Sequence, residues 1–339
     1  MPMKKHIGLI GASSHLAKRI LPSLQEIPDI SVDAIASRDV SKAKEMAKMW
    51  NIPLTYTRYE DLLENPDIDG VYISTPPALH APWIKKALSQ DKHVLCEKPL
   101  VLTTQELYPL LHLASQKQKI LMPAWMYRFH PQWQKLKEIL SQNLIGKIQM
   151  ITIHISYESK EKTNIRFNKS LGGGVLNDIG CYALSALSFL FEIFPLSLTC
   201  TSLLDKDTEV DILTTGVLSY PDFQATFTVC MEMYRYQRLR IFGSDGMIEM
   251  EYPFNPPQDK DAHLFLFSSH GEKTFSFSPF NPYTEEWKVF LQSMEKPCLP
   301  LSPKEMLKET FLLEQCQQAI HKKKTILLKI PSQLKKHFS

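Results

Sequence analysis

The stretch IGLIGASSHLAKRI, residues 7–20, decides the fold. Its first four residues are small or apolar and predict a β-strand, and a helix is expected to begin at Leu16 and to end near Pro28. A short turn that starts with a glycine, residues 11–15, joins the two. A strand that passes through a glycine turn into a helix is typical of the first unit of a dinucleotide-binding sheet.

The rest of the first third repeats this alternation of strand and helix. Further strands are expected at residues 32–36, 71–74, 93–96 and 120–124, and further helices at residues 41–50, 80–89 and 103–116. Ser41 and the pair Thr103-Thr104 are the expected N-caps. Strands that alternate with helices predict a parallel, doubly wound sheet, so residues 1–123 are interpreted as an α/β Rossmann domain.

The pattern changes after residue 124, where extended runs follow one another with few helices between them. Strands are expected at residues 147–157, 198–203, 212–219, 224–233, 239–241, 247–250 and 263–267, and helices at residues 132–141, 181–191, 285–295 and 303–321. Successive strands predict antiparallel pairing. Residues 124–339 are therefore interpreted as an α+β domain with a large, mostly antiparallel open sheet, whose C-terminal helix packs back on the first domain.

Composition excludes several classes of protein. The chain has 339 residues, 44% hydrophobic and 22% charged, and a net charge of +3, which is too mild to indicate a nucleic-acid partner. No apolar run approaches the length of a membrane span, and the first apolar run is too short for a signal peptide. The cysteines have neither disulfide nor metal spacing, so free thiols, no bound metal and a cytoplasmic location are expected. They are Cys96, Cys181, Cys200, Cys230, Cys298 and Cys316.

The turn itself departs from the Gly-x-Gly-x-x-Gly fingerprint. Gly11 stands where the tight turn needs it, but Ser13 replaces the second glycine and one extra residue precedes Leu16. The hydroxyls of Ser13 and Ser14 can hydrogen-bond phosphate oxygens at the helix N-terminus. The candidate pyrophosphate-binding residues are Gly11, Ala12, Ser13, Ser14, His15 and Leu16. The alternative is an ordinary strand–turn–helix without a ligand.

Two further strand ends carry candidate cofactor residues. Ser37 and Arg38 follow the second strand, where a hydroxyl and a permanent cation suit a ribose phosphate, which favours NADP slightly over NAD. Arg38 could instead pair with the neighbouring Asp39. The third strand leads to Thr75, Pro76 and His80 at the carboxyl edge of the sheet, where the nicotinamide half is expected. The alternative for His80 is a helix cap or a surface histidine.

Several segments, taken in order, resemble one known family. They are the glycine turn, Ser74-Thr75-Pro76-Pro77 with Leu79-His80, Glu97-Lys98-Pro99-Leu100, Met126-Tyr127-Arg128-Phe129-His130-Pro131, and Gly172-Gly173-Gly174-Val175-Leu176-Asn177-Asp178-Ile179-Gly180-Cys181-Tyr182. Together they resemble the Gfo/Idh/MocA family, named for glucose–fructose oxidoreductase and inositol dehydrogenase. The resemblance runs from residue 4 to about residue 325. Two features depart from it, namely the missing second glycine and Asn177 at a position that is more often apolar or small.

The resemblance implies a Rossmann domain followed by a sheet domain through which copies of the chain form a homo-oligomer. It implies NAD or NADP as cofactor, and a sugar, a polyol or a related secondary alcohol or ketone as substrate. Lys98 matches the family's catalytic lysine, Asp178 its acidic residue, and Tyr182 a position held by histidine or tyrosine. The tyrosine resembles the xylose and dihydrodiol dehydrogenase branch. The resemblance also implies a Lys98–Pro99 bond that is often cis, and Glu97, Lys98 and Arg128 as cofactor contacts.

These residues suit hydride transfer at an alcohol carbon, because the protein must manage the alcohol proton. Tyr182 is a candidate acid/base, and a nearby cation such as Lys98 lowers the pKa of a phenol from about 10. Asp178, four residues before Tyr182, can orient Lys98 or a substrate hydroxyl.

Each of these roles has a purely structural alternative. Lys98 could be a surface charge, Asp178 an N-cap, Tyr182 a packed aromatic, and Arg128 the partner of an acid. For the whole chain, the alternative to a dehydrogenase is a non-catalytic sensor of dinucleotides or sugars with the same fold. Residues 158–170 are expected to contribute to substrate specificity.

Overall fold

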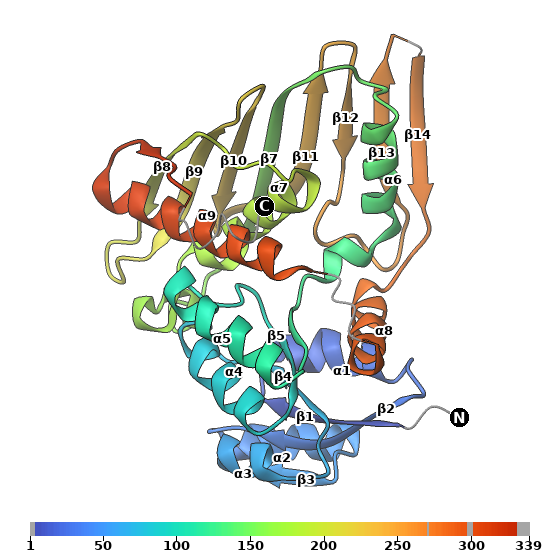
Figure 1. Cartoon of the computed structure of the whole chain (residues 1–339), viewed down its shortest axis with the longest axis vertical. Coiled ribbons are helices and arrows are strands. Elements are labelled where there is room, and N and C mark those ends of the chain that lie inside the picture. The colour runs from blue at the N-terminus through green and yellow to red at the C-terminus, as the bar shows by residue number, and fades with distance from the viewer. Residues whose placement is uncertain (1–3, 270, 297–300, 331–339) are drawn as a thin grey trace. The chain divides into compact units, whose positions relative to one another are not determined.

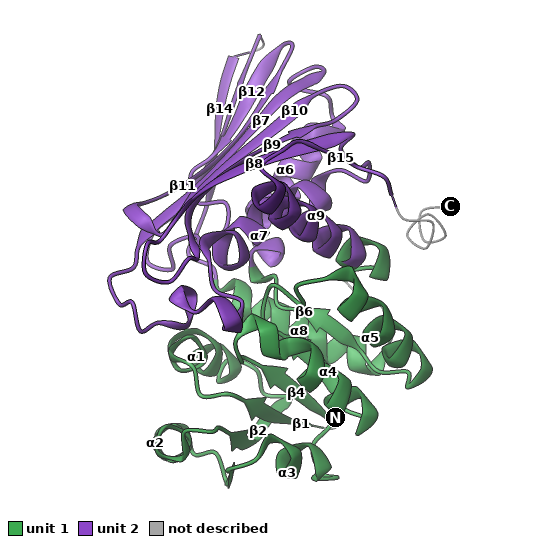
Figure 2. Ribbon diagram, turned by 90° about the vertical axis from the view of Figure 1, so that its left-hand side faces the viewer, with its two compact units in different colours: residues 1–126, 281–306 green, residues 127–280, 307–339 purple. Residues whose placement is uncertain are grey.

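The computed structural model describes residues 4–269, 271–296 and 301–330 and divides the chain into two units (Figure 2). The first unit comprises residues 1–126 and 281–306, and the second comprises residues 127–280 and 307–339. The predicted boundary at residue 123 is therefore close. Residues 281–306 were expected in the second domain, whereas the division into compact units groups them with the first unit.

A six-stranded parallel sheet forms the centre of the first unit (Figure 1). Its strands lie in the order β3-β2-β1-β4-β5-β6. They are β1 (Lys5–Ile10), β2 (Ile30–Ala36), β3 (Leu54–Tyr56), β4 (Gly70–Ile73), β5 (His93–Cys96) and β6 (Leu121–Pro123). Because the order reverses beside β1, the carboxyl ends of β1 and β4 flank the switch point at which such sheets bind ligands. The predicted Rossmann fold is confirmed.

The helices of the first unit begin and end close to the predicted positions. They are α1 (Leu21–Leu24), α2 (Val40–Trp50), α3 (Tyr59–Glu64), α4 (His80–Ser89), α5 (Thr104–Gln116) and α8 (Pro282–Glu295). Asp39, not Ser41, caps α2, since its carboxylate accepts the Lys42 N–H. Thr103 caps α5 in a reciprocal capping box with Glu106. The short elements β3 and α3 were not predicted.

A nine-stranded sheet forms the second unit. Its order is β14-β13-β12-β11-β7-β10-β9-β8-β15, and β7 with β10 is the parallel pair among otherwise antiparallel neighbours. The strands are β7 (Ile148–Glu158), β8 (Ser197–Leu204), β9 (Asp211–Ser219), β10 (Gln224–Cys230), β11 (Glu232–Gly243), β12 (Gly246–Met250), β13 (Ala262–Ser268), β14 (Gly271–Phe277) and β15 (Ile326–Leu327). The predicted mostly antiparallel sheet is confirmed, whereas β14 and β15 were missed.

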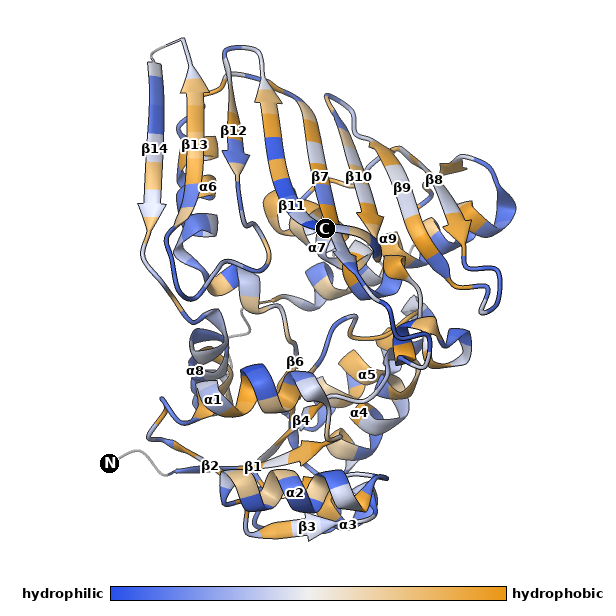
Figure 3. Ribbon diagram, turned by 180° about the vertical axis from the view of Figure 1, so that it is seen from behind, coloured by the Kyte–Doolittle hydropathy of each residue, from blue (hydrophilic) through white to orange (hydrophobic). Residues whose placement is uncertain are grey.

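The helices α6 (Pro131–Ser141), α7 (Cys181–Leu190) and α9 (Pro303–Lys322) cover one face of this sheet (Figure 2). Apolar and polar residues alternate along its strands, as a sheet with one covered and one open face requires (Figure 3). The stretch Lys169–Leu190 is long and apolar enough to span a membrane. However, 72% of its most apolar part is buried inside the structure, as is typical of a core helix.

The cysteines of the described residues are all free and buried. Cys298 lies outside the described residues.

Candidate active site

Gly11 shapes the turn that follows β1. Its φ of +100° favours glycine, and its N–H donates to the Ala36 carbonyl at 2.9 Å. A Cβ at this position would lie 3.1 Å from the Ser74 carbonyl oxygen. The turn therefore passes close to the ends of both β2 and β4, and a larger residue would push it away from them.

Ser13 and a π-helical turn explain how the altered fingerprint is accommodated. The Ser13 hydroxyl accepts the Leu16 N–H at 3.1 Å and so begins the helix. The next turn, η1 (Leu16–Ile20), is π-helical, with the Leu21 N–H bonded to the Leu16 carbonyl. Such a turn holds one residue more than an α-helical turn, so the helix absorbs the extra residue. The Leu16 side chain is fully buried in the core, so the predicted cofactor contact of Leu16 would involve its backbone.

The end of β2 presents an exposed cation. The Ser37 hydroxyl accepts the Asp39 N–H at 3.1 Å, and the Asp39 carboxylate accepts from the Lys42 N–H and lies 3.4 Å from its ammonium group. Asp39 is thus engaged by Lys42 rather than by Arg38. The Arg38 side chain is exposed and makes no ion pair with any residue that the structure describes. A guanidinium in this position can receive a phosphate.

The end of β4 presents a buried hydroxyl. Thr75 Oγ1 is buried without a hydrogen-bond partner in residues 4–269, 271–296 and 301–330. A buried hydroxyl without a partner is costly unless a ligand or water satisfies it. Pro76 follows with a φ of −57° and leads into the short turn η2 (Pro77–Leu79).

His80 connects the loop after β4 with the loop after β5. Its ring is fully buried, with Nε2 2.7 Å from the Thr75 carbonyl oxygen and Nδ1 2.9 Å from the Pro99 carbonyl oxygen. Burial lowers the pKa of His80, and the two carbonyl oxygens act in the opposite direction. Both ring nitrogens therefore face carbonyl oxygens of the protein, and the cofactor contact by His80 stays a prediction.

Lys98 follows a buried carboxylate at the end of β5. The Lys98–Pro99 bond is cis, and the Lys98 side chain is half-buried. Glu97 accepts hydrogen bonds from the Tyr72 hydroxyl and from the Lys98 N–H, and His15 Nε2 lies 3.3 Å from its Oε1. Burial acts to raise the pKa of Glu97, but His15, Lys98 and Tyr72 lower it to about 2.

Helix α8 adds a face that sequence reasoning assigned to another domain. The Tyr283 ring packs edge-on against the His15 ring, with 5.6 Å between the ring centroids. The ring centroids of Trp287 and Tyr72 are also 5.6 Å apart. Glu286 lies on the same face, fully buried, with neither carboxyl oxygen hydrogen-bonded within the described residues. Burial and the charge of Glu97 raise the pKa of Glu286 well above its usual value, which favours the neutral acid.

In the second unit, Asp178 lies in the π-helical turn η6 (Leu176–Gly180) that leads into α7. Its Oδ2 accepts a hydrogen bond from the Tyr157 hydroxyl at 2.5 Å and from Arg166 Nε at 2.7 Å. Asp178 therefore joins helix, strand and loop. The sequence analysis did not identify Tyr157 or Arg166 as site residues. The one signal for Arg166 is its position within residues 158–170, which were expected to contribute to substrate specificity.

Asn177 has a structural explanation. Its amide nitrogen donates to the Gly172 carbonyl at 3.2 Å and lies 3.4 Å from that of Gly173, and its oxygen accepts from Gln317 Nε2 at 2.8 Å. The side chain thus ties the glycine turn to α9. A small or apolar residue would leave these buried groups without their partners.

Tyr182 is 8% exposed and belongs to an aromatic cluster. Its ring centroid lies 5.9 Å from that of Tyr127 and 5.4 Å from that of Phe254. The packing fixes the direction of the ring, as a positioned acid/base would require. A packed aromatic and a candidate catalytic group are therefore compatible descriptions of Tyr182.

Arg128 serves the interior of the second unit. It is 4% exposed, forms an ion pair with Glu309 and donates from Nη2 to the Ser185 hydroxyl at 2.8 Å. Ser185 lies on α7, three residues after Tyr182, so this polar cluster anchors that helix. The expected alternative, in which Arg128 pairs with an acid, is present, and the cofactor contact by Arg128 stays a prediction.

The features of the first unit fit a dinucleotide. The close turn at Gly11, the unpartnered Thr75 hydroxyl and the exposed Arg38 all follow the carboxyl ends of the parallel strands. The Rossmann fold and the residues at the carboxyl ends of its strands define a nicotinamide-dinucleotide-dependent oxidoreductase. Residues 5–125 match the profile of the oxidoreductase family with an NAD-binding Rossmann fold, and residues 133–249 match the GFO/IDH/MocA C-terminal domain. The chain belongs to the Gfo/Idh/MocA family and is an NAD(P)-dependent oxidoreductase.

Named relatives extend along most of the chain. A D-xylose 1-dehydrogenase (NADP(+)) of Haloferax volcanii is 33% identical over 85% of this chain and 88% of its own length. A trans-1,2-dihydrobenzene-1,2-diol dehydrogenase of Xenopus tropicalis is 32% identical over 71% of this chain and 74% of its own. The crystal structure of KijD10, a 3-ketoreductase from Actinomadura kijaniata in complex with NADP and TDP-benzene, superimposes with a TM-score of 0.88 and 26% identity, covering 94% of this chain and 98% of KijD10.

Proposed function

We propose that this oxidoreductase prefers NADP and transfers hydride between the nicotinamide and a secondary alcohol or ketone of a sugar, a polyol or a related compound. The observation that carries the cofactor preference is Arg38, an exposed guanidinium that its neighbour Asp39 leaves without an ion pair among the described residues. The substrate class rests on the relatives, which include a xylose dehydrogenase, a dihydrodiol dehydrogenase and a 3-ketoreductase.

The cofactor contacts that we propose follow the strand ends. Backbone and hydroxyl groups of the turn bind the pyrophosphate, because the Ser13 hydroxyl can donate to phosphate while it accepts the Leu16 N–H. Ser37 and Arg38 bind the ribose phosphate, and Thr75 offers its hydroxyl to the nicotinamide half. The complete set is Gly11, Ala12, Ser13, Ser14, His15, Ser37, Arg38, Thr75, Pro76, Glu97 and Lys98.

NADP supplies the hydride acceptor or donor, and the protein manages the proton and the substrate oxygen. We assign Lys98 to the substrate oxygen, where an ammonium group stabilises developing negative charge. Glu97 fixes the Lys98 backbone through its N–H. Tyr182 is assigned to the proton and Asp178 to a substrate hydroxyl.

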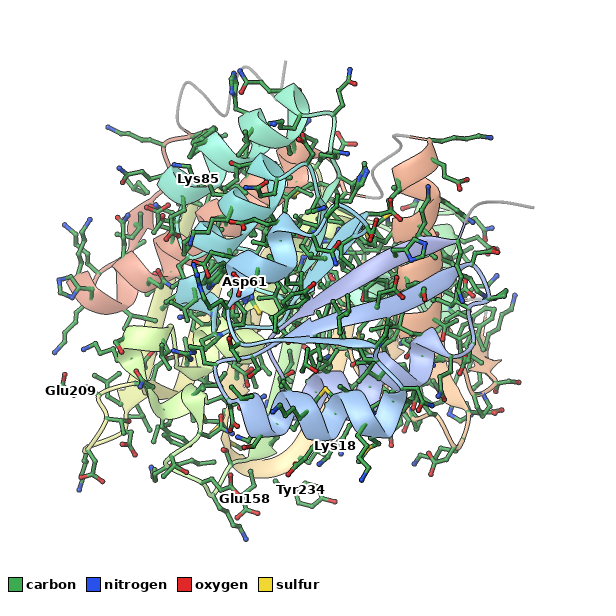
Figure 4. All side chains as sticks on the ribbon, turned by 90° about the horizontal axis from the view of Figure 1, so that it is seen from below. Lys18, Asp61, Lys85, Glu158, Glu209 and Tyr234 are labelled. Carbon is green, nitrogen blue, oxygen red and sulfur yellow. The ribbon has the colours of Figure 1, made fainter. Side chains whose placement is uncertain are left out.

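Fluorescence titration with NADPH and NADH tests the cofactor proposal, and a turnover screen of aldoses, polyols and dihydrodiols tests the substrate class. Lys98→Ala is expected to lower kcat at least about 100-fold while cofactor affinity changes by less than about threefold. Lys85→Ala, at an exposed lysine of α4 (Figure 4), is the matched control and is expected to retain full turnover. No binding of either cofactor at millimolar concentration, or unchanged turnover in Lys98→Ala, would contradict the proposal.

We also propose that a second copy of the chain binds the open face of the nine-stranded sheet and that the protein acts in the cytoplasm. Phe265 and Phe267 point to the half-exposed side of β13, stacked at 6.4 Å, and Met150 on β7 is 40% exposed. Apolar rows of this kind are typical of interfaces. Light scattering should give the mass of an oligomer for the wild type and a lower mass for Phe265→Asp. The buried free thiols support a reducing compartment.

A further inference from the structure

The loop between β7 and the glycine turn at residues 172–174 carries several cations, and each faces an acid. The pairs are Lys160 with Glu158 at 3.3 Å, Lys162 with Asp205 and with Glu232 at 3.1 Å, Arg166 with Asp178 at 2.7 Å, and Lys169 with Glu209 at 3.2 Å. Glu158 and Glu209 are exposed partners that lie at the periphery of the molecule (Figure 4). Each basic residue of this loop therefore has an acidic partner that offsets its positive charge.

The pair of Arg166 and Asp178 is more shielded than the exposed pair of Lys169 and Glu209, and it also includes a tyrosine hydroxyl. The Asp178 side chain is 15% exposed and that of Arg166 is 40% exposed, whereas the Lys169 and Glu209 side chains are about 70% exposed. The Tyr157 hydroxyl donates to the same Asp178 oxygen as Arg166 Nε. Burial and the charge of Asp178 raise the pKa of Tyr157, so its phenol stays protonated and acts as a donor.

The Arg166 guanidinium keeps one edge available. Nε bonds Asp178, and Nη1 bonds the Asn164 side-chain oxygen at 3.3 Å. Tyr157 is a further neighbour of the guanidinium, whose carbon lies 5.8 Å from the Tyr157 ring centroid, and the Arg166 side chain is 40% exposed. The exposed edge can donate hydrogen bonds to a ligand, while the attached carboxylate cancels its charge.

The backbone of Arg166 is held by the glycine turn. The Gly174 N–H donates to the Arg166 carbonyl at 2.8 Å, and the Gly173 N–H donates to the Asn168 carbonyl at 2.9 Å. A Cβ on Gly173 would come within 2.5 Å of the Arg166 carbonyl oxygen. The glycines therefore allow the loop to lie against the turn before α7, and this packing brings Arg166 to Asp178.

We propose that Arg166, Asp178 and Tyr157 form a charge-neutral subsite that binds adjacent hydroxyl groups of an unphosphorylated substrate. Hydroxyl groups donate and accept, so they match a guanidinium edge beside a carboxylate. A phosphoryl or diphosphoryl group needs cations whose charge is not already cancelled, and this loop provides none. The substrate class is thereby narrowed from sugars in general to neutral sugars and polyols. The inference rests on the proposed function.

The test compares kcat/KM for a neutral sugar with kcat/KM for its phosphate ester and for a nucleotide-linked sugar. The wild type is expected to favour the neutral sugar at least about tenfold. Asp178→Asn leaves Arg166 uncompensated and is expected to shift the ratio of ester to neutral sugar at least about tenfold toward the ester, even though both rates fall. Glu209→Gln, which uncovers the exposed Lys169, is the control and should leave the ratio unchanged.

Arg166→Gln adds an independent arm, with an expected rise of about tenfold in KM for the neutral sugar and a smaller change in kcat. NADPH titration of each variant verifies that the first unit still binds its cofactor. A wild type that prefers the phosphorylated substrate, or an unchanged ratio in Asp178→Asn, overturns this inference while the proposed function stands. Absence of NADPH binding in the wild type overturns the proposed function itself.

Discussion

The imidazole Nε2 of His15 lies 3.3 Å from Oε1 of Glu97, so the helix after the glycine turn is joined to the residue that precedes Lys98. The Glu97 side chain is 17% exposed and remains ionised because His15, Lys98 and Tyr72 offset the effect of burial. The helix that follows the glycine turn and the loop that carries Lys98 are therefore connected within the first unit by one buried carboxylate.

Glu97→Gln is expected to change how stability depends on pH. The folded-state pKa of Glu97 is about 2, below the ordinary value of 4.5, so its contribution to stability is present above pH 4.5 and is lost as the pH falls toward 2. The shift corresponds to about 3 kcal/mol. Denaturant unfolding between pH 2.5 and 7 should show a smaller acid loss in the variant than in the wild type. Glu285→Gln serves as the control, and parallel curves for Glu97→Gln and wild type would contradict the assignment.

Glu286→Gln is expected to change the pH dependence of stability in the direction opposite to Glu97→Gln. The folded-state pKa of Glu286 is raised, so its contribution to stability is full below pH 4.5 and is lost as the pH rises toward the folded-state value. A neutral amide of similar shape removes this loss. The free energy of unfolding of the variant relative to the wild type should therefore increase from pH 4.5 to pH 8. A difference that is constant with pH would show that Glu286 is charged in the folded protein.

Arg38→Ala is expected to weaken NADPH much more than NADH. Loss of a charge-assisted contact to phosphate costs about 1.5–3 kcal/mol, or roughly 10- to 100-fold in Kd. NADH lacks that phosphate, so its Kd should change less than about threefold. Parallel fluorescence titrations measure both, with Arg235→Ala on an exposed part of β11 as the control. Equal losses for the two cofactors would assign Arg38 a general role in the fold.

Local sequence patterns predicted most of the first unit. The run at residues 7–20 and the alternation of strands and helices after it predict a parallel sheet. This works because the spacing of apolar residues along each element shows whether it is a strand or a helix and which of its faces is buried. The strand β3 and the helix α3 are too short to show a period. Helix α8 was recognised as a helix but expected in the second domain, since periodicity shows that a face is buried and not which unit buries it.

Local backbone features of the candidate site were predictable where a motif is contiguous, as with the tight turn at Gly11 and the cis bond after Lys98. The site was not predictable where a role depends on contacts between distant segments. Leu16, His80 and Arg128 were assigned to the cofactor from their positions, but the structure turns each side chain into the interior. Glu286 and Arg166 carry no local signal, because their surroundings come from residues far away in the chain.

His80→Ala is expected to reduce turnover more than cofactor affinity. A neutral imidazole carries one N–H, so the change leaves one of the two carbonyl oxygens beside the ring, those of Thr75 and Pro99, without its donor, at about 1–3 kcal/mol. The loop that carries Lys98 then loses its tie to the end of β4. We expect kcat to fall at least about tenfold while the Kd of NADPH changes less than about threefold. His80→Asn, which restores one donor, should recover part of kcat, and a loss confined to cofactor affinity would contradict the positioning role.

Gly173→Ala tests whether the glycine turn supports the loop that carries Arg166. The added Cβ would overlap the Arg166 carbonyl and come within 2.8 Å of the Asn168 carbonyl, both of which are backbone atoms with little freedom to move. Overpacking of this kind costs about 1–3 kcal/mol. Denaturant unfolding should show that loss, and KM for the neutral sugar should rise as it does in Arg166→Gln. Ser170→Ala, at an exposed loop position, is the control. A stable Gly173→Ala variant with unchanged KM would show that the loop reaches Asp178 without this turn.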